Sequence, residues 1–326
     1  MNKCLELARL GEYYVAPNPM VGAVLVESGA CRAERIVGEG WHKQFGGAHA
    51  EVNCFRDAEQ RGITNFKDCT LYVSLEPCSH YGKTPPCTQL IIEKGVKKVV
   101  IGMTDPHPLV AGKGIEQLRE HGIEVVVGVM EAECRELNKR FLCLHEQHRP
   151  YVILKWAQTK DGFIDRGEMG QEPLIISTPV TKQLVHKMRA ENMAIMVGTN
   201  TVIKDNPRLN VTRWVGRNPI RVTVDRRNRI EEKGLRILDD SAPTIVYREQ
   251  TDWPYIVSDL AKRGIHSILV EGGTTLLNHI LGTGIYDEIQ VEVADFEIGE
   301  GVAAPKVVLP KEYELIDNHR LYSLRK

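Results

Sequence analysis

Four residues in the first third of the chain have the types and spacing of a catalytic zinc site. His49 and Glu51 stand two positions apart, Cys78 follows a proline, and Cys87 lies nine positions further on. Zinc binds imidazole nitrogen and thiolate sulfur, and a catalytic site keeps one of its four coordination positions for water. His49, Cys78 and Cys87 would supply three ligands, and the pKa of the bound water would fall to roughly 7. Glu51 would stay off the metal and move protons.

This set of groups indicates hydrolytic deamination of an amino-substituted pyrimidine or purine, which needs a nucleophilic hydroxide and a proton shuttle. The order His-x-Glu, then Pro-Cys, then a second cysteine is that of the zinc deaminase signature. Eight residues separate the two cysteines here, where that signature has two. The alternative is that Cys78 and Cys87 are buried apolar residues, as scattered cysteines usually are. The combination of all four residues favours the zinc site.

The elements around these residues must bring them together. Residues i and i+2 of a regular helix point about 200° apart, so His49 and Glu51 share a site only if a helix is just beginning there. The glycine pair before His49 permits an irregular entry, and the apolar spacing after Glu51 predicts a helix. The proline pair before Cys87 predicts a second helix start. Two helix N-termini facing one metal would favour the thiolate form of each cysteine.

The first half of the chain alternates strand and helix patterns, which is typical of a layered α/β domain with its site beyond the strand ends. The strands are expected at residues 21–26, 70–75, 99–101 and 125–127. A last helix is expected over residues 134–141. The polar stretch 145–150 ends in proline and is interpreted as the domain boundary.

The second half starts the alternation again. Its strands are expected at residues 151–156, 194–197, 221–224, 267–270 and 288–293. A helix is expected over 179–190, and the polar residues 199–209 are expected to form a loop. The Glu-Gly-Gly-Thr-Thr turn at 271–275 joins a strand to a helix, where backbone amides can hold a phosphate. An ordinary tight turn has the same pattern, so the motif leaves both interpretations open.

Bulk properties limit the compartment and the partners. A chain of 326 residues with 42% apolar content is long enough for two domains. Its net charge of −1 gives no bulk attraction to nucleic acid or anionic lipid. It has no run of eighteen apolar residues and no apolar signal core at the N-terminus, and its eight cysteines suit a reducing compartment. We therefore expect a cytoplasmic protein.

Longer motifs resemble the bifunctional riboflavin-biosynthesis deaminase–reductase family. In the first half they lie at residues 18–22, 49–52, 76–87, 105–114 and 137–141. In the second half they lie at 154–157, 161–162, 176–179, 204–207 and 270–273. The long spacing between the two cysteines, unusual for a general deaminase, is what this family has. Three positions depart from the family pattern, namely Ile175, Asn206 and Thr212.

The resemblance implies an α/β protein with two domains. Residues 1–146 would form a cytidine-deaminase-like three-layer domain, and residues 150–326 a dihydrofolate-reductase-like domain. The first would hydrolyse the 2-amino group of 2,5-diamino-6-ribosylamino-4(3H)-pyrimidinone 5′-phosphate. The second would reduce the ribosyl group to ribityl. The implied cofactors are Zn²⁺ and NADPH, and the implied partners are the phosphorylated pyrimidine and further copies of the chain, without nucleic acid or membrane.

The resemblance also implies a role for individual residues. The catalytic residues would be Glu51, Lys155 and Asp205. The zinc ligands would be His49, Cys78 and Cys87. Substrate would contact Asn18, His42, His80, Lys83, Arg189, Leu209 and Glu271. NADPH would contact Ala157, Ser177, Thr201, Asp205, Gly272, Gly273, Thr274 and Thr275.

One alternative function is a deaminase of tRNA or of free nucleobases, with the second half as a non-catalytic nucleotide-binding module. Phosphate contacts dominate affinity for nucleic acid, so a tRNA deaminase would usually show a basic bias. It would also usually have a Cys-x-x-Cys pair. The sequence has neither feature. Oxidation of NADPH in the presence of deaminated substrate separates the two functions.

Overall fold

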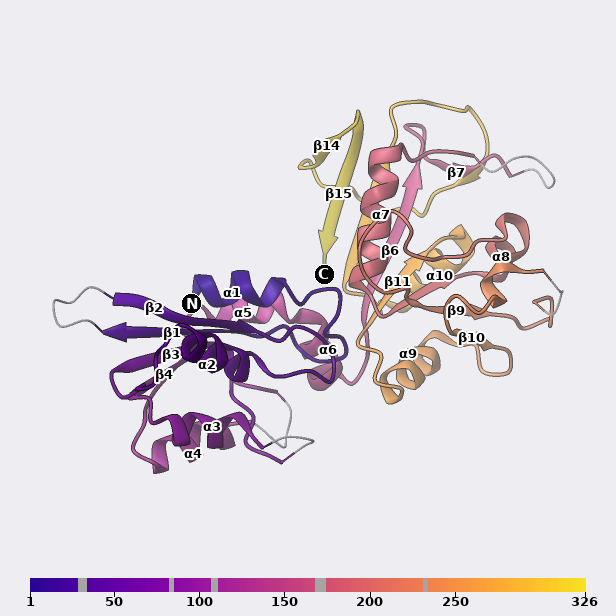
Figure 1. The fold of residues 1–326 in the computed structure, drawn as a ribbon. Helices are drawn as coiled ribbons and strands as arrows, with labels where there is room; N and C mark the ends of the chain where they lie inside the picture. The colour runs from indigo at the N-terminus through magenta and orange to yellow at the C-terminus, as the bar shows by residue number, and fades with distance from the viewer. Residues whose placement is uncertain (29–33, 82–84, 107–110, 168–173, 231–233) are drawn as a thin grey trace. The chain divides into compact units, whose positions relative to one another are not determined.

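The computed structural model describes residues 1–28, 34–81, 85–106, 111–167, 174–230 and 234–326. The chain divides into two compact units, Met1–Gln147 and His148–Lys326. Both units have a central sheet with helices packed on it (Figure 1). Within the described ranges, none of the helices has the length and apolar character needed to cross a membrane.

The first unit contains, over its described residues, a five-stranded sheet with the order β2-β1-β3-β4-β5. Strand β1 is antiparallel to β2 and β3, whereas β3, β4 and β5 are parallel. The strands are β1 (Gly22–Ser28), β2 (Glu34–Trp41), β3 (Cys69–Leu75), β4 (Lys98–Met103) and β5 (Glu124–Val127). The four strands expected in this half are confirmed, and β2 is a strand that the sequence pattern did not predict.

Helices cover both faces of this sheet. The helices are α1 (Asn2–Arg9), α2 (Ala50–Gln60), α3 (Cys87–Lys94), α4 (Lys113–Glu120), α5 (Glu131–Leu137) and α6 (Lys139–Gln147). Figure 1 shows α1 and α5 on one side of the strands and α3 and α4 on the other. Separate apolar clusters fill the layers, among them one around Phe55 and Leu118 and another around Leu5 and Phe141. The expected three-layer α/β domain is therefore confirmed.

The single helix expected over residues 134–141 is wrong, because the chain turns at Asn138 between α5 and α6. The side chain of Asn138 is buried and bonds the backbone of Met20. Its amide oxygen accepts from the Met20 backbone N at 2.8 Å, and its amide nitrogen donates to the Met20 carbonyl at 3.0 Å. Such side-chain bonds to distant backbone compete with helix formation. They fix the loop that carries Asn18.

The second unit contains, over its described residues, an eight-stranded sheet with the order β10-β9-β8-β11-β6-β12-β15-β14. Neighbours from β10 to β12 are parallel, and β15 is antiparallel to β12 and β14. The strands are β6 (Tyr151–Gln158), β8 (Ala194–Val197), β9 (Ile220–Val224), β10 (Thr244–Tyr247), β11 (Ser267–Glu271), β12 (Glu288–Val293), β14 (Glu314–Ile316) and β15 (His319–Arg325). Short strands β7 (Phe163–Asp165) and β13 (Val302–Ala303) pair separately.

Helices pack against both faces of this sheet as well. They are α7 (Pro179–Glu191), α8 (Thr199–Asp205), α9 (Trp253–Lys262), α10 (Thr274–Thr283) and the 3₁₀ helix η1 (Arg236–Leu238). Trp253 of α9 and Leu277 of α10 pack in one cluster with Leu154, while Val202 of α8 packs with Ile195 in another. The strands and the helix expected in this half are confirmed. The mostly parallel sheet agrees with the dihydrofolate-reductase-like domain.

The loop expected over residues 199–209 is wrong for its first seven residues, which form α8. Gly198 begins the helix, and Asn206 ends it in the left-handed conformation at φ 41°. Val202 is the buried residue of this helix. One buried apolar position among polar neighbours leaves no helical periodicity to detect, which is why the sequence pattern indicated a loop.

Candidate functional site

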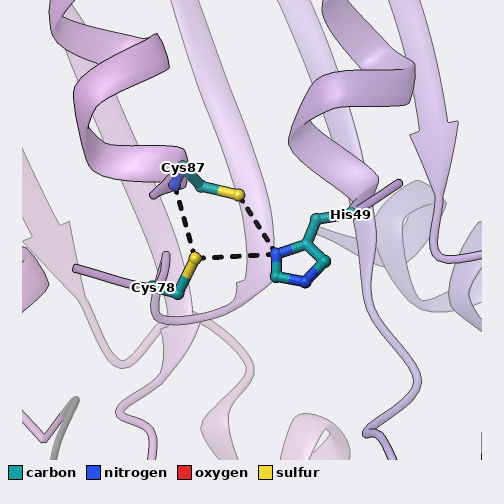
Figure 2. A group of neighbouring side chains, drawn as sticks. All are labelled: His49, Cys78 and Cys87. Atoms are coloured by element: carbon teal, nitrogen blue, oxygen red, sulfur yellow. Dashed lines mark hydrogen bonds between the residues drawn. The ribbon is translucent and has the colours of Figure 1, made fainter. Parts of the chain in front are cut away.

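The three expected zinc ligands converge at the edge of the first sheet (Figure 2). Cys78 follows the end of β3, Cys87 is the first residue of α3, and His49 immediately precedes α2. His49 Nδ1 lies 3.6 Å from Cys78 Sγ and 3.3 Å from Cys87 Sγ. All three ligand atoms lie within 4.8 Å of one another. The long segment between the cysteines therefore does not keep their sulfurs apart.

The donor set fits a tetrahedral zinc ion. Zinc–sulfur bonds of about 2.3 Å and zinc–nitrogen bonds of about 2.0–2.1 Å put neighbouring ligand atoms roughly 3.5–3.8 Å apart. The two nitrogen–sulfur separations, 3.3 and 3.6 Å, are close to that spacing. Since Nδ1 faces both sulfurs, Nδ1 is the ring nitrogen of His49 that would bind the metal.

The start of α2 explains how His49 and Glu51 share one site. His49 has extended backbone angles, φ −69° and ψ 165°, and the helix begins only at Ala50. Glu51 lies in the first turn and is buried. A Cβ atom on Gly40 of β2 would lie 2.4 Å from the Ala50 carbonyl oxygen. Gly40 therefore allows the first turn of α2 to pack directly on the sheet, with His49 and Glu51 at its edge.

Hydrogen bonds and burial shift the pKa values of the groups at this site. A hydrogen bond from the Cys87 thiol lowers the pKa of Cys78 to about 4 against the effect of burial, and His49 lowers it further. Cys78 in turn raises the pKa of His49 to about 9. Burial raises the pKa of Glu51 above its ordinary value. A carboxyl with a raised pKa holds and releases a proton nearer to neutral pH.

Asn18 and His42 lie beside the metal-binding residues. The Asn18 amide donates to His42 Nε2 at 3.1 Å, and His42 Nδ1 donates to the Ala48 carbonyl at 3.0 Å. Because one ring nitrogen accepts and the other donates, these bonds fix the orientation of the ring in its neutral form, and burial lowers its pKa. The ring centroids of His42 and His49 are 5.7 Å apart. His80 is exposed, and Lys83 lies outside the described residues.

A buried carboxylate next to Cys78 organises the neighbouring loop. Glu76 accepts hydrogen bonds from the backbone N–H groups of Asp105, Gly112 and Gly114 at 3.2, 3.0 and 3.0 Å. The last two groups are at the start of α4, where a negative charge is favourable. Glu76 thus fixes the chain between β3 and Cys78 against α4.

We expect Glu76→Gln to destabilise the first unit by about 2 kcal/mol, because the amide leaves buried N–H groups without a charged acceptor. Urea unfolding followed by circular dichroism measures the change. Glu120→Gln, at an exposed position of α4, is the control and should leave the transition unchanged. Equal midpoints for the two variants would contradict the anchoring role of Glu76.

The second unit has a cavity of about 1190 Å³ over the face of its sheet. The predicted substrate and cofactor residues that line it are Lys155, Ala157, Ser177, Arg189, Thr201, Asp205, Glu271, Gly272, Gly273, Thr274 and Thr275. Leu209 is different, because its side chain packs in the apolar cluster around Ile195 and Val202. Its contact with substrate stays a prediction.

Two basic side chains in the wall of this cavity, Arg189 and Lys155, lie next to carboxylates. Arg189 donates to both carboxylate oxygens of Glu271, at 2.9 and 2.6 Å. Lys155 Nζ lies 3.9 Å from Glu292 Oε2. Burial lowers the pKa of Lys155, whereas burial and the charge of Asp165 raise the pKa of Asp205. The cavity therefore contains a cation and an acid whose pKa values are shifted toward each other, an arrangement common at functional sites.

The glycine turn between β11 and α10 opens onto the same cavity. Gly272 and Gly273 have φ values of 115° and 71°, which L side chains rarely adopt. Gly273 directly precedes α10. The first backbone amides of this ten-residue helix are therefore placed at the cavity wall, as a phosphate site requires.

Of the three departures from the family pattern, Asn206 has a local explanation. Asn206 ends α8 with a left-handed backbone, which asparagine tolerates better than most residues. The side-chain oxygen of Asn206 also accepts from the Arg236 backbone N at 2.6 Å. The backbone N of Thr212 donates to His186 at 3.1 Å. Ile175 is 71% exposed and lines the cavity.

Sequence reasoning missed a polar group behind Lys155, formed by Thr181, Glu292 and His319. One signal could have found it. Strand β12 has Glu288, Gln290 and Glu292 at alternate positions, so polar side chains share one face of a strand that lies inside the sheet. Glu76 is the first residue of the motif at 76–87, and the sequence alone indicates no role for it.

Comparisons with known proteins agree with this geometry. Residues 150–317 match the profile of the RibD C-terminal domain, and residues 1–103 match the cytidine and deoxycytidylate deaminase zinc-binding region. The riboflavin biosynthesis protein RibD of Aquifex aeolicus is 39% identical, with 93% of this chain and 88% of that protein covered. RibD of Escherichia coli is 36% identical, with 92% and 88% covered.

Solved structures are similar over the full chain. A crystal structure from Thermotoga maritima, described as a diaminohydroxyphosphoribosylaminopyrimidine deaminase/5-amino-6-(5-phosphoribosylamino)uracil reductase, has a TM-score of 0.86 at 37% identity. That match covers 100% of this chain and 97% of the other. Acinetobacter baumannii RibD has a TM-score of 0.85 at 32% identity, with 99% and 97% covered.

Proposed function

The chain belongs to the RibD family of riboflavin biosynthesis proteins, and from this premise we propose that it catalyses two consecutive steps. Residues 1–146 deaminate 2,5-diamino-6-ribosylamino-4(3H)-pyrimidinone 5′-phosphate by hydrolysis. Residues 150–326 then reduce the ribosyl group of the product to ribityl with NADPH. The observation that carries the proposal is the convergence of His49, Cys78 and Cys87 beside the buried Glu51.

In the deaminase, His49, Cys78 and Cys87 would hold the zinc ion. Zinc, when bound, supplies Lewis-acid activation of the attacking water. Glu51 takes a proton from that water and delivers a proton to the leaving amine, a role that its raised pKa suits. Asn18, held by the neutral His42 ring, orients the pyrimidine. His80 contacts the substrate from the segment between the cysteines, and Lys83, which lies outside the described residues, is proposed as a further substrate contact.

In the reductase, NADPH supplies the hydride, and the chain orients it against the open-chain form of the sugar. Ala157, Ser177, Thr201 and the turn 272–275 would line the cofactor, and the amides at the start of α10 would hold one of its phosphates. Arg189 and Glu271 fix each other and present polar atoms to the substrate. Lys155 and Asp205 lie near the reacting carbon. Fixed geometry of this kind lowers the barrier by orientation alone.

We expect Lys155→Ala to lower the rate of reduction roughly 10²-fold, since it removes a positive donor aimed into the cavity, and to leave deamination unchanged. The two rates are measured separately, as ammonia release and as NADPH oxidation with deaminated substrate. Lys160→Ala, at an exposed site in the same unit, serves as the control. Equal loss of both activities would show that the two halves do not act independently.

The function as a whole is tested by giving the purified chain the diaminopyrimidine with and without NADPH. Ammonia should appear in both cases, and NADPH should be consumed only after deamination. Ammonia release without any NADPH oxidation would leave the deaminase alone. That alternative is not favoured, because the RibD C-terminal domain profile covers the second half. We further propose that the protein is a cytoplasmic homo-oligomer. Its ligand is the small phosphorylated pyrimidine, and it does not bind nucleic acid.

A further inference from the structure

A buried carboxylate, Glu292, lies behind the reductase cavity on β12. Its side chain is 2% exposed. It accepts hydrogen bonds from Ser177 Oγ at 2.6 Å, Thr181 Oγ1 at 2.6 Å and His319 Nδ1 at 2.7 Å. Ser177 lies in the segment just before α7, Thr181 in the first turn of α7, and His319 at the start of β15. A carboxylate with so many donors is held in one position.

The register of the sheet puts Lys155 beside Glu292. Strand β12 pairs with β6 so that Glu292 is opposite Ala157, two positions after Lys155. Residues at alternate positions of a strand share a face, so Glu292 and Lys155 point to the same side of the sheet. Lys155 Nζ lies 3.9 Å from Glu292 Oε2.

The other carboxylate next to Lys155 already has a partner. Glu271 of β11 is opposite Lys155 in the register, but both of its oxygens are bound by Arg189. Burial and, to a smaller extent, the charge of Arg189 lower the pKa of Lys155. The charges of Glu271 and Glu292 act in the opposite direction and raise it. Burial raises the pKa of Glu292, but Lys155 and the three hydrogen-bond donors outweigh this and keep it low. Glu292 is thus ionised and balances the ammonium charge.

We propose that Glu292 is a positioning residue for the reductase, which holds the Lys155 ammonium in its charged form at the cavity wall. The inference rests on the proposed reductase function. Two of its partners, Lys155 and Ser177, line the cavity, so a shift of Glu292 moves groups that face the reactants. Thr181 and His319 keep Glu292 in place from behind the cavity.

The test is Glu292→Gln in the full chain, with the reductase kcat measured across pH. Deamination is expected to stay unchanged, and the reductase kcat to fall roughly tenfold to a hundredfold. The alkaline limb of the kcat profile should move to lower pH, because the variant loses a negative charge that favours protonated Lys155. Glu271 and Arg189 keep their mutual pairing in this variant.

Glu288→Gln is the matched control. Glu288 is a buried glutamate four positions earlier on the same face of β12, and it accepts from the Tyr151 hydroxyl at 3.1 Å. Its loss should affect stability and leave the alkaline limb in place. If Glu292→Gln also leaves the limb in place, or lowers kcat no more than Glu288→Gln does, Glu292 is merely structural and the inference is overturned.

Two further measurements test the role of Glu292 if the variant does not fold or the reductase assay shows no activity. Should Glu292→Gln fail to fold, Glu292→Asp keeps the charge but withdraws it from Lys155, and the same limb should move in the same direction by less. Should the wild-type chain oxidise no NADPH, the reductase function itself fails. The ionisation of Lys155 is then followed by NMR of ¹³C-labelled lysine, and an unchanged titration in the Glu292 variant would overturn the inference independently.

Discussion

Glu51→Gln is expected to abolish deamination while the zinc stays bound. The carboxyl of Glu51 is buried next to the three ligands without being one of them. An amide of the same shape can neither take a proton from water nor give one to the leaving amine. Loss of a general acid–base group typically costs 10²- to 10⁴-fold in rate. Ammonia release under saturating substrate measures the loss, and zinc analysis of the same sample shows whether the metal is retained.

Glu59→Gln is the control for this variant, since Glu59 is exposed on the same helix. It should release ammonia at the wild-type rate. NADPH oxidation with deaminated substrate should be normal in both variants, because Glu51 lies in the other unit. A near-normal rate of deamination in Glu51→Gln would remove Glu51 from the mechanism, and loss of zinc would make its role structural.

Cys78→Ala is expected to lose both the metal and deamination. A site with three protein ligands depends on each of them, and Cys78 has the thiolate with the lowered pKa. The zinc content should fall from about one ion per chain to nearly none, and ammonia release should fall below detection. Reduction of deaminated substrate should continue, since the described residues that line the cavity of the second unit all belong to that unit.

Cys69→Ala provides the matched control for the cysteine change. Cys69 is also buried, at the opposite end of β3 from Cys78. It should keep zinc and deamination with a modest loss of stability. If Cys78→Ala retains stoichiometric zinc, the metal is held by other residues and the proposed ligand set is incorrect.

The zinc ligands could be predicted from sequence because residue type and order carry most of the information. His49, Cys78 and Cys87 are chemically suited to one metal and to little else in that order. Even the start of α2 followed from the requirement that His49 and Glu51 share a site, and His49 is the residue just before that helix. Most strands of the two sheets were likewise predictable from short apolar runs, whereas β2, β10, β14 and β15 were not predicted.

The rest depends on contacts between distant parts of the chain. Glu292 accepts hydrogen bonds from Ser177 and Thr181, which are 115 and 111 positions away in the sequence. A local sequence pattern does not predict contacts over such separations. Helix α8 was missed because its burial rests on Val202. The break at Asn138 depends on Met20, 118 positions earlier. Tertiary contacts of this kind override local preference.

Zinc analysis of the purified wild-type chain, combined with an assay of ammonia release, tests the central claim most directly. The arrangement of His49, Cys78 and Cys87 predicts about one zinc ion per chain, and activity that disappears when a chelator removes the metal and returns when zinc is restored. A chain that deaminates its substrate at full rate with no stoichiometric metal would contradict it.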